Sequence, residues 1–289
     1  MKIIIKLILV LFITTSYSQS QAIKEFSIEN QKFFGSKLSQ AEYLLHKVKP
    51  MGILDKNDPE LPQFITMLMN DPIEVLSIGE IDMYLQDNDM DYSNIGGSIQ
   101  DSLSRNKKGT SAKYFVIHDT STPNFKNKDF PKNINDDTWE QNDVEVRWKY
   151  KKGEIRKGPH AFIGRTGKIF FPIDFSVPWR ATGFENKVLD KAISRGLFIH
   201  IELVQPRKSK EGKWKDNDVV SPDPGFTQEQ YDKLALLYIC ASARSGNWLI
   251  PAYHAVLDQG FKNGHDDPQN FELNEFSDSI EALVKELKN

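Results

Sequence analysis

Two short apolar runs, residues 114–117 and 197–204, limit the fold more than any other part of the sequence. Both are rich in β-branched and aromatic residues and are shorter than an average helix, which is typical of strands buried in a sheet. In the second run, the two-residue period of a strand places His200 and Glu202 on one face. Such a pair in an otherwise apolar strand is costly to bury without a purpose. An edge strand that exposes both residues is the alternative.

Three further elements are predicted around these strands. Residues 160–171 form two apolar stretches around a Gly turn, which indicates a β-hairpin. Thr227 and Gln230 have the spacing of a capping box, so we predict a helix that begins there and ends at Gly246. A short terminal helix is predicted after a cap near Ser277.

The segment from residue 19 to residue 110 is mainly helical and polar in pattern. Apolar residues between 26 and 45 recur at three- and four-residue steps, which predicts an amphipathic helix. The acidic stretch 87–91 is similar to a calcium loop, but Tyr92 stands where that loop needs Gly and Ser98 where it needs Glu. We therefore expect an N-terminal helical extension that packs on the domain behind it.

Residues 1–18 have the pattern of a cleaved secretory signal peptide. Lys2 and Lys6 supply the positive start, residues 7–13 are apolar, and small residues stand at the expected cleavage site. An uncleaved membrane anchor is the alternative, but the apolar core is far shorter than the ~20 residues that span a bilayer. We expect an exported protein, periplasmic or secreted, with no stable membrane span after cleavage.

Charge and cysteine usage narrow the class of partner. Removal of the two signal lysines changes the formal charge from −3 to −5, with both signs interspersed. This balance argues against a nucleic-acid partner. Cys240 is the sole cysteine, so the chain has neither an internal disulfide nor a cysteine for lipid attachment at a mature N-terminus.

Imidazole and carboxylate groups gather near the C-terminus, at His254 and in the stretch 264–268, which includes His265, Asp266 and Asp267. Gly and Pro punctuate this part of the chain, so we expect it to be loop. Imidazole and carboxylate are the groups that bind a divalent metal of the zinc type. Histidines that merely form hydrogen bonds in polar loops are the alternative.

His118 adds a third candidate group, directly after the first apolar run. Side chains at the end of a strand are held rigidly, which suits a functional site. A histidine that only forms hydrogen bonds at a strand end is the alternative for this residue alone.

Five stretches between residues 113 and 271 carry a family resemblance, through their order and spacing rather than through any single motif. They are VIHDT at 116–120, HAFI with a later Gly at 160–167, VPWRATG at 177–183, IHIELV at 199–204, and His254 with HDDP at 265–268. They resemble I-H-H-T, H-Y-L-I with D-G, A-W-H-A-G, S-I-G-I-E-L-V, and G-H with K-x-D-P-G. These elements characterise the type-2 family of zinc-dependent N-acetylmuramoyl-L-alanine amidases.

The same fold occurs in peptidoglycan-recognition proteins and a phage lysozyme. The resemblance therefore implies an α/β fold with a central mixed β-sheet flanked by helices. The amidase-like catalytic domain would occupy residues 111–289, behind the helical extension at 19–110.

The resemblance implies that His118, His254 and Asp267 bind zinc. Asp266 and Asp267 compete for the third position, and Asp267 is preferred because it directly precedes Pro268, as the family's ligand does. The interval of 13 residues between His254 and Asp267 is long for the family, so we expect an enlarged loop. Two imidazoles and one carboxylate leave a tetrahedral zinc with one open position, the arrangement of a catalytic site.

The resemblance also implies substrate contacts from His160, Trp179, Arg180 and His200. Two of these depart from the family pattern: Arg180 stands where a substrate-contacting His is frequent, and His200 stands at a usual Gly. Asp119 replaces the second His of the opening motif, which is not normally a ligand.

Two residues are expected to take part in catalysis beside the metal. Zinc would lower the pKa of a bound water to about 7 and polarise the scissile carbonyl. Glu202 is the expected general base, which passes the proton of the water to the leaving amine. His265 stands where the motif often carries Lys, and a cation there would face the charge that develops on the carbonyl oxygen. A simple cap of the loop is the alternative for His265.

The implied reaction is hydrolysis of the amide bond between N-acetylmuramic acid and L-alanine in peptidoglycan or muropeptides. Export past the cytoplasmic membrane agrees with the location of that substrate. One alternative is a non-catalytic peptidoglycan-binding protein on the same fold. The other is a secreted structural or adaptor domain whose histidines only form hydrogen bonds.

Overall fold

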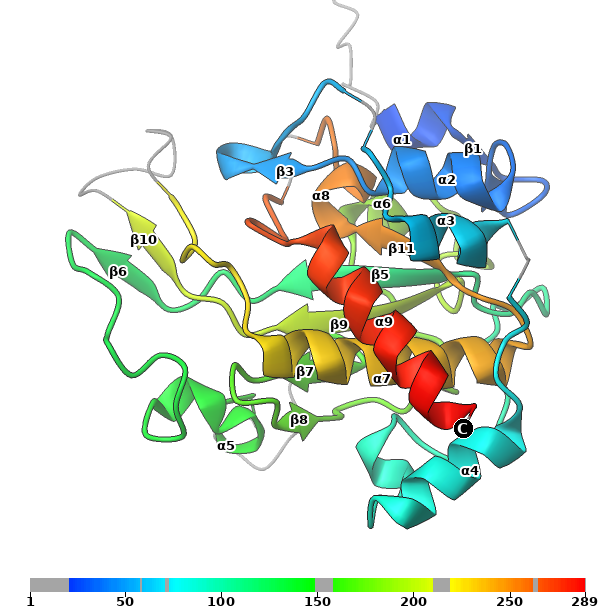
Figure 1. Cartoon of the computed structure of the whole chain (residues 1–289). Helices are drawn as coiled ribbons and strands as arrows, with labels where there is room; N and C mark the ends of the chain where they lie inside the picture. Colours follow the sequence, from blue (N-terminus) through cyan, green and yellow to red (C-terminus); the bar gives the residue numbers. More distant parts are fainter. Residues whose placement is uncertain are drawn as a thin grey trace, which may run out of the picture.

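A five-stranded β-sheet forms the centre of the molecule (Figure 1). The computed structural model describes residues 21–57, 59–70, 73–148, 158–209, 219–261 and 265–288. In spatial order the strands are β11 (Ile250–Tyr253), β5 (Tyr114–Asp119), β9 (Phe198–Leu203), β7 (Ala161–Ile163) and β8 (Ile169–Phe170). The first four run parallel, and β8 lies antiparallel beside β7. With helices on both sides of the sheet, the predicted α/β class with a central mixed sheet is confirmed.

The predicted strands and hairpin are present, and one further strand is added. The two apolar runs form the neighbouring central strands β5 and β9, and the hairpin consists of β7 and β8. No strand is predicted at β11, because Pro251 interrupts its pattern. Since β11 is an edge strand that pairs only with β5, a proline that lacks an N–H is tolerated there. The expectation that His254 lies in a loop is wrong, because it begins α8 (His254–Leu257) directly after β11.

Helix α7 (Gln228–Ser245) covers one face of the sheet, as its capping pattern predicts (Figure 1). The Thr227 hydroxyl accepts from the Gln230 amide, and the Gln230 side chain accepts from the Thr227 amide. Gly246 ends the helix in the left-handed conformation, with φ of 68°. On the sheet side, the ring of Tyr238 meets that of Phe115 at 5.3 Å.

Helix α9 (Leu273–Leu287) packs on α7 and begins earlier than predicted. The expected cap near Ser277 is wrong, because Ser277 lies in the second turn. Ser279 faces α7 instead, where its hydroxyl donates to Asp232 at 2.8 Å and accepts from Gln228 at 2.9 Å. The local pattern around Ser279 indicates a helix cap, but this serine contributes to the contact between α7 and α9.

The first part of the N-terminal segment, around Phe33 and Gln40, packs against the opposite face of the sheet, whereas later helices of the segment contact α7 and α9. Tyr114 and Phe198 stack on this face with ring centroids 5.0 Å apart, and Phe33 meets Tyr114 edge-on at 5.4 Å. The Tyr114 hydroxyl accepts from the Phe33 amide and donates to Gln40, both at 2.8 Å. One continuous hydrophobic cluster therefore contains residues of the N-terminal segment and of the sheet.

Helices make up only part of that segment. They are α1 (Gln21–Lys24), α2 (Lys37–Leu44), α3 (Gln63–Met69) and α4 (Ile78–Asp87). The amphipathic helix predicted over 26–45 is wrong in its first half, where β1 (Phe26–Ser27) pairs with β2 (Lys32–Phe33). This pairing brings the rings of Phe26 and Phe33 together at 5.1 Å and buries both. After the acidic stretch, Asp91 caps the short helix η2 (Tyr92–Asn94) by accepting from the Ser93 amide.

The remaining elements are short. They are β3 (Val48–Lys49), η1 (Pro50–Gly52), β4 (Ile53–Leu54), β6 (Asn124–Lys126), η3 (Glu140–Asn142), α5 (Val144–Trp148), α6 (Gly183–Lys187) and β10 (Arg207–Ser209). The predicted signal peptide lies outside the described residues. Within the described part of the chain, no helix combines the length and the apolarity that a bilayer span requires.

We expect Cys240 to be unreactive in the folded protein. It is fully buried in α7, and burial raises the pKa of its thiol to about 12. Because the thiolate is the reactive form, 5,5′-dithiobis(2-nitrobenzoic acid) at pH 8 should label the native chain negligibly and the guanidinium-unfolded chain once. Rapid stoichiometric labelling of the native chain would contradict this burial.

Candidate metal centre

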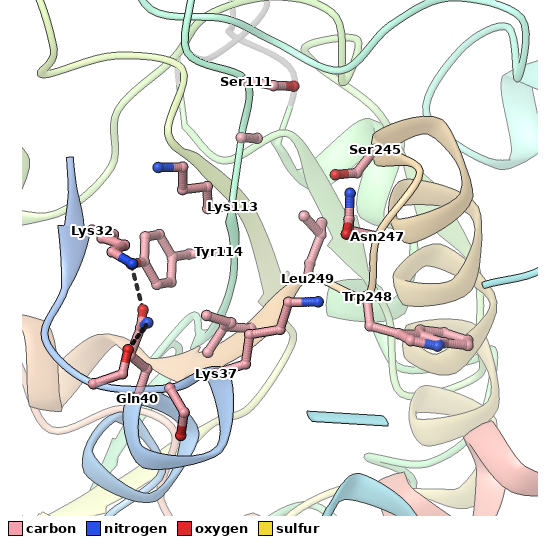
Figure 2. Close-up of a pocket in the computed structure, with 14 residues that line it drawn as sticks. Lys32, Lys37, Gln40, Ser111, Lys113, Tyr114, Ser245, Asn247, Trp248 and Leu249 are labelled. Carbon is pink, nitrogen blue, oxygen red and sulfur yellow. Dashed lines mark hydrogen bonds between the residues drawn. The ribbon is translucent and has the colours of Figure 1, made fainter. Parts of the chain in front are cut away.

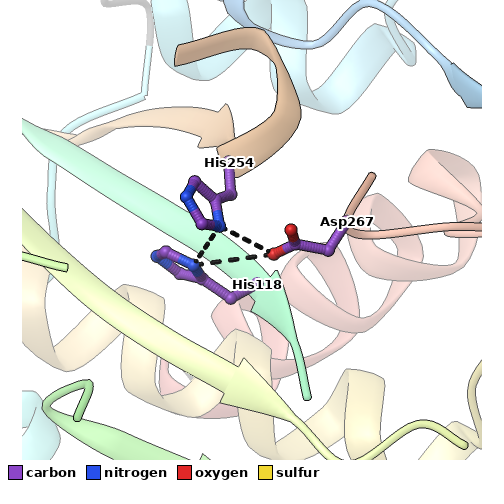
Figure 3. A group of neighbouring side chains, drawn as sticks. All are labelled: His118, His254 and Asp267. Carbon is purple, nitrogen blue, oxygen red and sulfur yellow. Dashed lines mark hydrogen bonds and ion pairs between the residues drawn. The ribbon is translucent and has the colours of Figure 1, made fainter. Parts of the chain in front are cut away.

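Three of the predicted site residues, His118, His254 and Asp267, come together at the carboxyl ends of β5 and β11 (Figure 3). His118 lies near the end of β5, and His254 directly follows β11, whose last residue Tyr253 pairs in register with Ile117. The carboxyl ends of two adjacent parallel strands therefore place both imidazoles side by side. Asp267 comes from the chain that precedes α9, and its carboxylate points toward both rings.

The three side chains are buried and their ligand atoms converge. The Nδ1 atoms of His118 and His254 lie 2.9 Å apart, and Asp267 Oδ2 lies 3.0 Å from the second and 3.6 Å from the first. A tetrahedral zinc with bonds of about 2.0–2.1 Å needs ligand atoms roughly 3.3 Å apart. The observed separations bracket that value, so this donor set fits a zinc ion.

The outer nitrogen of each imidazole already has a partner. His254 Nε2 lies 3.1 Å from Asp258 Oδ2, so it carries a proton that it donates to this carboxylate. His118 Nε2 lies 3.1 Å from His200 Nδ1. Histidines that bind metals almost always engage their second nitrogen in this way. When both rings are neutral and protonated at their outer nitrogens, their Nδ1 lone pairs point at one another, and a cation between them would relieve the repulsion.

The electrostatics of the centre also favour a cation. Burial lowers the pKa of His118 well below its usual value, and the adjacent His254 lowers it further. Burial also opposes a charge on His254, but Asp267 and Asp258 outweigh it and raise the pKa of this ring well above the usual value. The carboxylates thus create a negative environment that either a proton or a metal ion neutralises.

The structure separates the roles of the two adjacent aspartates. Asp266 accepts from the Gln269 side chain at 2.6 Å, and its other oxygen lies 3.8 Å from Arg207. Of the pair, Asp267 faces the two rings, and its Oδ2 also accepts from the Asp119 amide at 3.2 Å. The Asp119 carboxylate in turn forms a 2.7 Å ion pair with Arg207. It also accepts from the Gln269 amide at 3.1 Å, which attaches the aspartate loop to the end of β5.

Glu202 and His265 are neighbours of the ligand group. Glu202 is the register partner of His118 in the parallel pair of β9 and β5, so both side chains lie on one face of the sheet. Glu202 is partly exposed, unlike the buried His118. The side chain of His265 is 53% exposed, and its Nδ1 lies 3.5 Å from Asp267 Oδ1. Its ring centroid is 4.0 Å from that of His254.

The four residues expected to contact substrate divide into two pairs. His160 and His200 are both fully buried, and His160 Nδ1 accepts from the His200 amide at 3.0 Å. Trp179 and Arg180 are partly exposed and contact the loop 190–196. The described contacts of Trp179 and Arg180 do not include the histidine centre.

Buried carboxylates behind the centre are the part of the site that the sequence does not predict. Asp258 lies one helical turn after His254, and this four-residue spacing was an available signal. Glu185, which contacts His200, belongs to a capping box with Thr182, a pattern that indicates only a helix start. Glu185 has no comparable spacing to a histidine of the centre, so the sequence offers no signal for its role.

A second group of ligand atoms overlaps the first. Atoms of His254, Asp258 and His265 also lie within 4.8 Å of one another. However, both oxygens of Asp258 accept backbone amides, from Gly183 at 3.0 Å and from Phe184 at 2.9 Å. These bonds suit Asp258 to support His254 rather than to bind a metal.

A cavity of about 430 Å³ lies at the opposite end of β5 (Figure 2). It is bordered by the N-terminus of α2, the start of β5 and the connection from α7 to β11. Its described lining includes Lys32, Lys37 and Lys113 but no His, Cys, Asp or Glu. Because that lining offers no metal ligands, the histidine centre rather than this cavity is the candidate metal site.

Comparison with known proteins adds little to this geometry. No family model matches the sequence, and no curated protein matches it. Among solved structures, the chain is similar to the Ph2119 endolysin from Thermus scotoductus MAT2119 bacteriophage Ph2119, with 14% identity and a TM-score of 0.34. The match covers 63% of this chain and 92% of that chain. At this level, the likeness carries no argument about activity.

Proposed function

We propose that this protein is a zinc-dependent N-acetylmuramoyl-L-alanine amidase. The observation that carries the proposal is the convergence of His118, His254 and Asp267 from three separate parts of the chain. The same three residues are those that the sequence resemblance implies as ligands. A buried partner on the outer nitrogen of each ring adds support, because ligating histidines need one.

The residues around the centre can divide the steps of hydrolysis. Bound zinc would supply a Lewis acid that polarises the scissile carbonyl and acidifies the attacking water. Glu202 would take one proton from that water and deliver it to the leaving amine of L-alanine. The water oxygen bonds to the lactyl carbonyl carbon while the carbon–nitrogen bond breaks, which yields a carboxylic acid and a free amine. His265 would donate a hydrogen bond to the carbonyl oxygen as negative charge develops there.

The substrate class follows from the resemblance and is part of the proposal. Peptidoglycan or a muropeptide would be the substrate, with Trp179 and Arg180 as proposed contacts. The chain would act after export, in the periplasm or outside the cell, with residues 1–18 removed. Residues 19–110 would be an extension of the catalytic domain at 111–289. A non-catalytic peptidoglycan-binding protein on the same fold is the competing proposal.

We expect the purified protein to release new amino termini of L-alanine from peptidoglycan. The expected products by mass spectrometry are intact glycan strands and free stem peptides, because the bond cut joins these two parts. Treatment with a chelator such as 1,10-phenanthroline should stop the release, and added zinc should restore it. Binding to peptidoglycan without release would favour the non-catalytic protein, and cleavage that survives complete metal removal would contradict the zinc centre.

A further inference from the structure

Two buried side chains continue the hydrogen-bond chain outward from His118. His200 Nδ1 lies 3.1 Å from His118 Nε2, and His200 Nε2 lies 3.2 Å from Glu185 Oε2. Both His200 and Glu185 are 0% exposed. Because burial of a carboxylate is costly unless it is hydrogen-bonded, the position of Glu185 calls for a purpose.

Glu185 determines the direction of every proton along this chain. Its Oε2 accepts from the amides of Ala181 and Thr182, at 3.0 and 3.1 Å, and from the Thr182 hydroxyl at 2.9 Å. As an acceptor, Glu185 requires His200 to donate through Nε2, and in a neutral imidazole this leaves His200 Nδ1 as an acceptor. His118 must then donate through Nε2, and its Nδ1 lone pair points into the centre.

The helix that carries Glu185 also supports the second histidine. At the start of α6, the amides of Gly183 and Phe184 hold the carboxylate of Asp258, which accepts from His254 Nε2. A Cβ atom on Gly183 would lie 2.8 Å from Asp258 Oδ2, so glycine permits this close approach. Helix α6 therefore helps to support both imidazoles of the centre. Glu185 is linked to His118 through His200, and the α6 amides hold Asp258, which accepts from His254.

The ring of His200 packs against a second buried histidine, His160. The ring of His160 stacks on that of His200, with centroids 5.7 Å apart and an interplanar angle of 10°. Burial lowers the pKa of His160 to about 3, and the nearby His200 lowers it further, so the ring is neutral. With both rings fully buried, neither reaches a substrate in this structure. A positional role is the one that remains for His200.

We infer that the His200–Glu185 pair is a positioning device that fixes the tautomer and orientation of His118 as a metal ligand. Neither residue would contact the metal or the substrate. The inference rests on the proposed zinc centre and deepens it. The resembled family usually has Gly at the position of His200, so the resemblance itself does not imply this device.

Zinc affinity tests the device directly, by competition of the purified full chain with a chromogenic chelator. His200→Leu removes the acceptor of the His118 proton, and Glu185→Gln replaces an acceptor oxygen by a donor NH2. Each change should raise the zinc dissociation constant about 10- to 100-fold, the usual effect of losing such a partner. His200→Asn keeps an amide oxygen near the position of Nδ1 and should restore most of the affinity.

A second measurement reads the tautomers themselves. Long-range 15N–1H correlation spectra of the zinc-loaded parent should show His200 protonated at Nε2 and unprotonated at Nδ1. Glu185→Gln should disturb this pattern. The control is Asn186→Ala, which removes a 2.7 Å bond to the Thr182 carbonyl in α6 but leaves Glu185 and Asp258 intact. Asn186→Ala should leave both zinc affinity and the tautomers unchanged.

The outcomes separate this inference from the proposed function. Parental zinc affinity in folded His200→Leu and Glu185→Gln, judged by circular dichroism, would overturn the positioning device alone. If His200→Leu fails to fold, parental affinity and tautomers in Glu185→Gln overturn it equally. A parent chain that binds no zinc would overturn the proposed centre and the device together.

Discussion

Replacement of His118 or His254 by alanine is expected to abolish stoichiometric zinc binding and amide hydrolysis. Each change leaves two protein ligands, one fewer than catalytic zinc sites have. Zinc content after dialysis, by plasma mass spectrometry, and release of L-alanine amino termini measure the two effects. Full zinc occupancy in either variant would refute the centre.

The adjacent aspartates provide a matched control for this experiment. Asp267→Ala removes the carboxylate that faces both rings, whereas Asp266→Ala removes one that bonds Gln269 and lies near Arg207. Zinc binding should therefore weaken more in Asp267→Ala than in Asp266→Ala. The reverse order would move the third ligand by one residue.

Glu202→Gln is expected to retain zinc while turnover falls by roughly two to four powers of ten, the usual contribution of a positioned general base. The substitution preserves size and shape but removes the proton acceptor. Because Glu202 lies beside His118 on the sheet and is not among the converging ligand atoms, metal content should not change. Turnover of a muropeptide substrate and zinc content should be measured on the same preparation.

Two results would change this assignment. Near-normal turnover in Glu202→Gln would transfer the role of base to another residue, with the exposed His265 as the first candidate. Loss of zinc from Glu202→Gln would instead place this residue among the ligands. A fall in turnover with zinc retained supports a base that does not bind the metal.

Local pattern predicts the centre of this fold well. The apolar runs at 114–117 and 197–204 form adjacent parallel strands, and strand alternation places His200 and Glu202 on the face that His118 shares. The helix after Thr227 follows from its capping box. Patterns fail where tertiary packing overrides them. The strands β1 and β2, which pair Phe26 with Phe33, replace the first half of the helix predicted over 26–45. The edge position of β11 allows that strand to contain Pro251.

The candidate site, like the fold, is predictable from the sequence only in part. The residues proposed as ligands are predictable because they follow strand ends or belong to a motif read along the chain. The groups that hold them are not predictable, since Glu185 meets His200 only through the packing of α6 against the sheet. A substrate role for His200 and His160 is expected from their positions in the resembled motifs, whereas the burial of both rings depends on tertiary packing that the motifs do not describe.

The aromatic contacts of Phe33 with Tyr114 bear on how this sequence can vary. Phe33 and Gln40 satisfy the Tyr114 hydroxyl from two sides, and they do so on the strand that carries His118 four residues later. Substitutions at the buried residues Phe33 and Gln40 therefore meet the same steric limits as substitutions inside the sheet. A shortened protein that begins at residue 111 would lose these partners and expose the stacked rings of Tyr114 and Phe198 to water. This part of the N-terminal segment therefore belongs to the hydrophobic core, although its described residues supply no ligand atom to the metal centre.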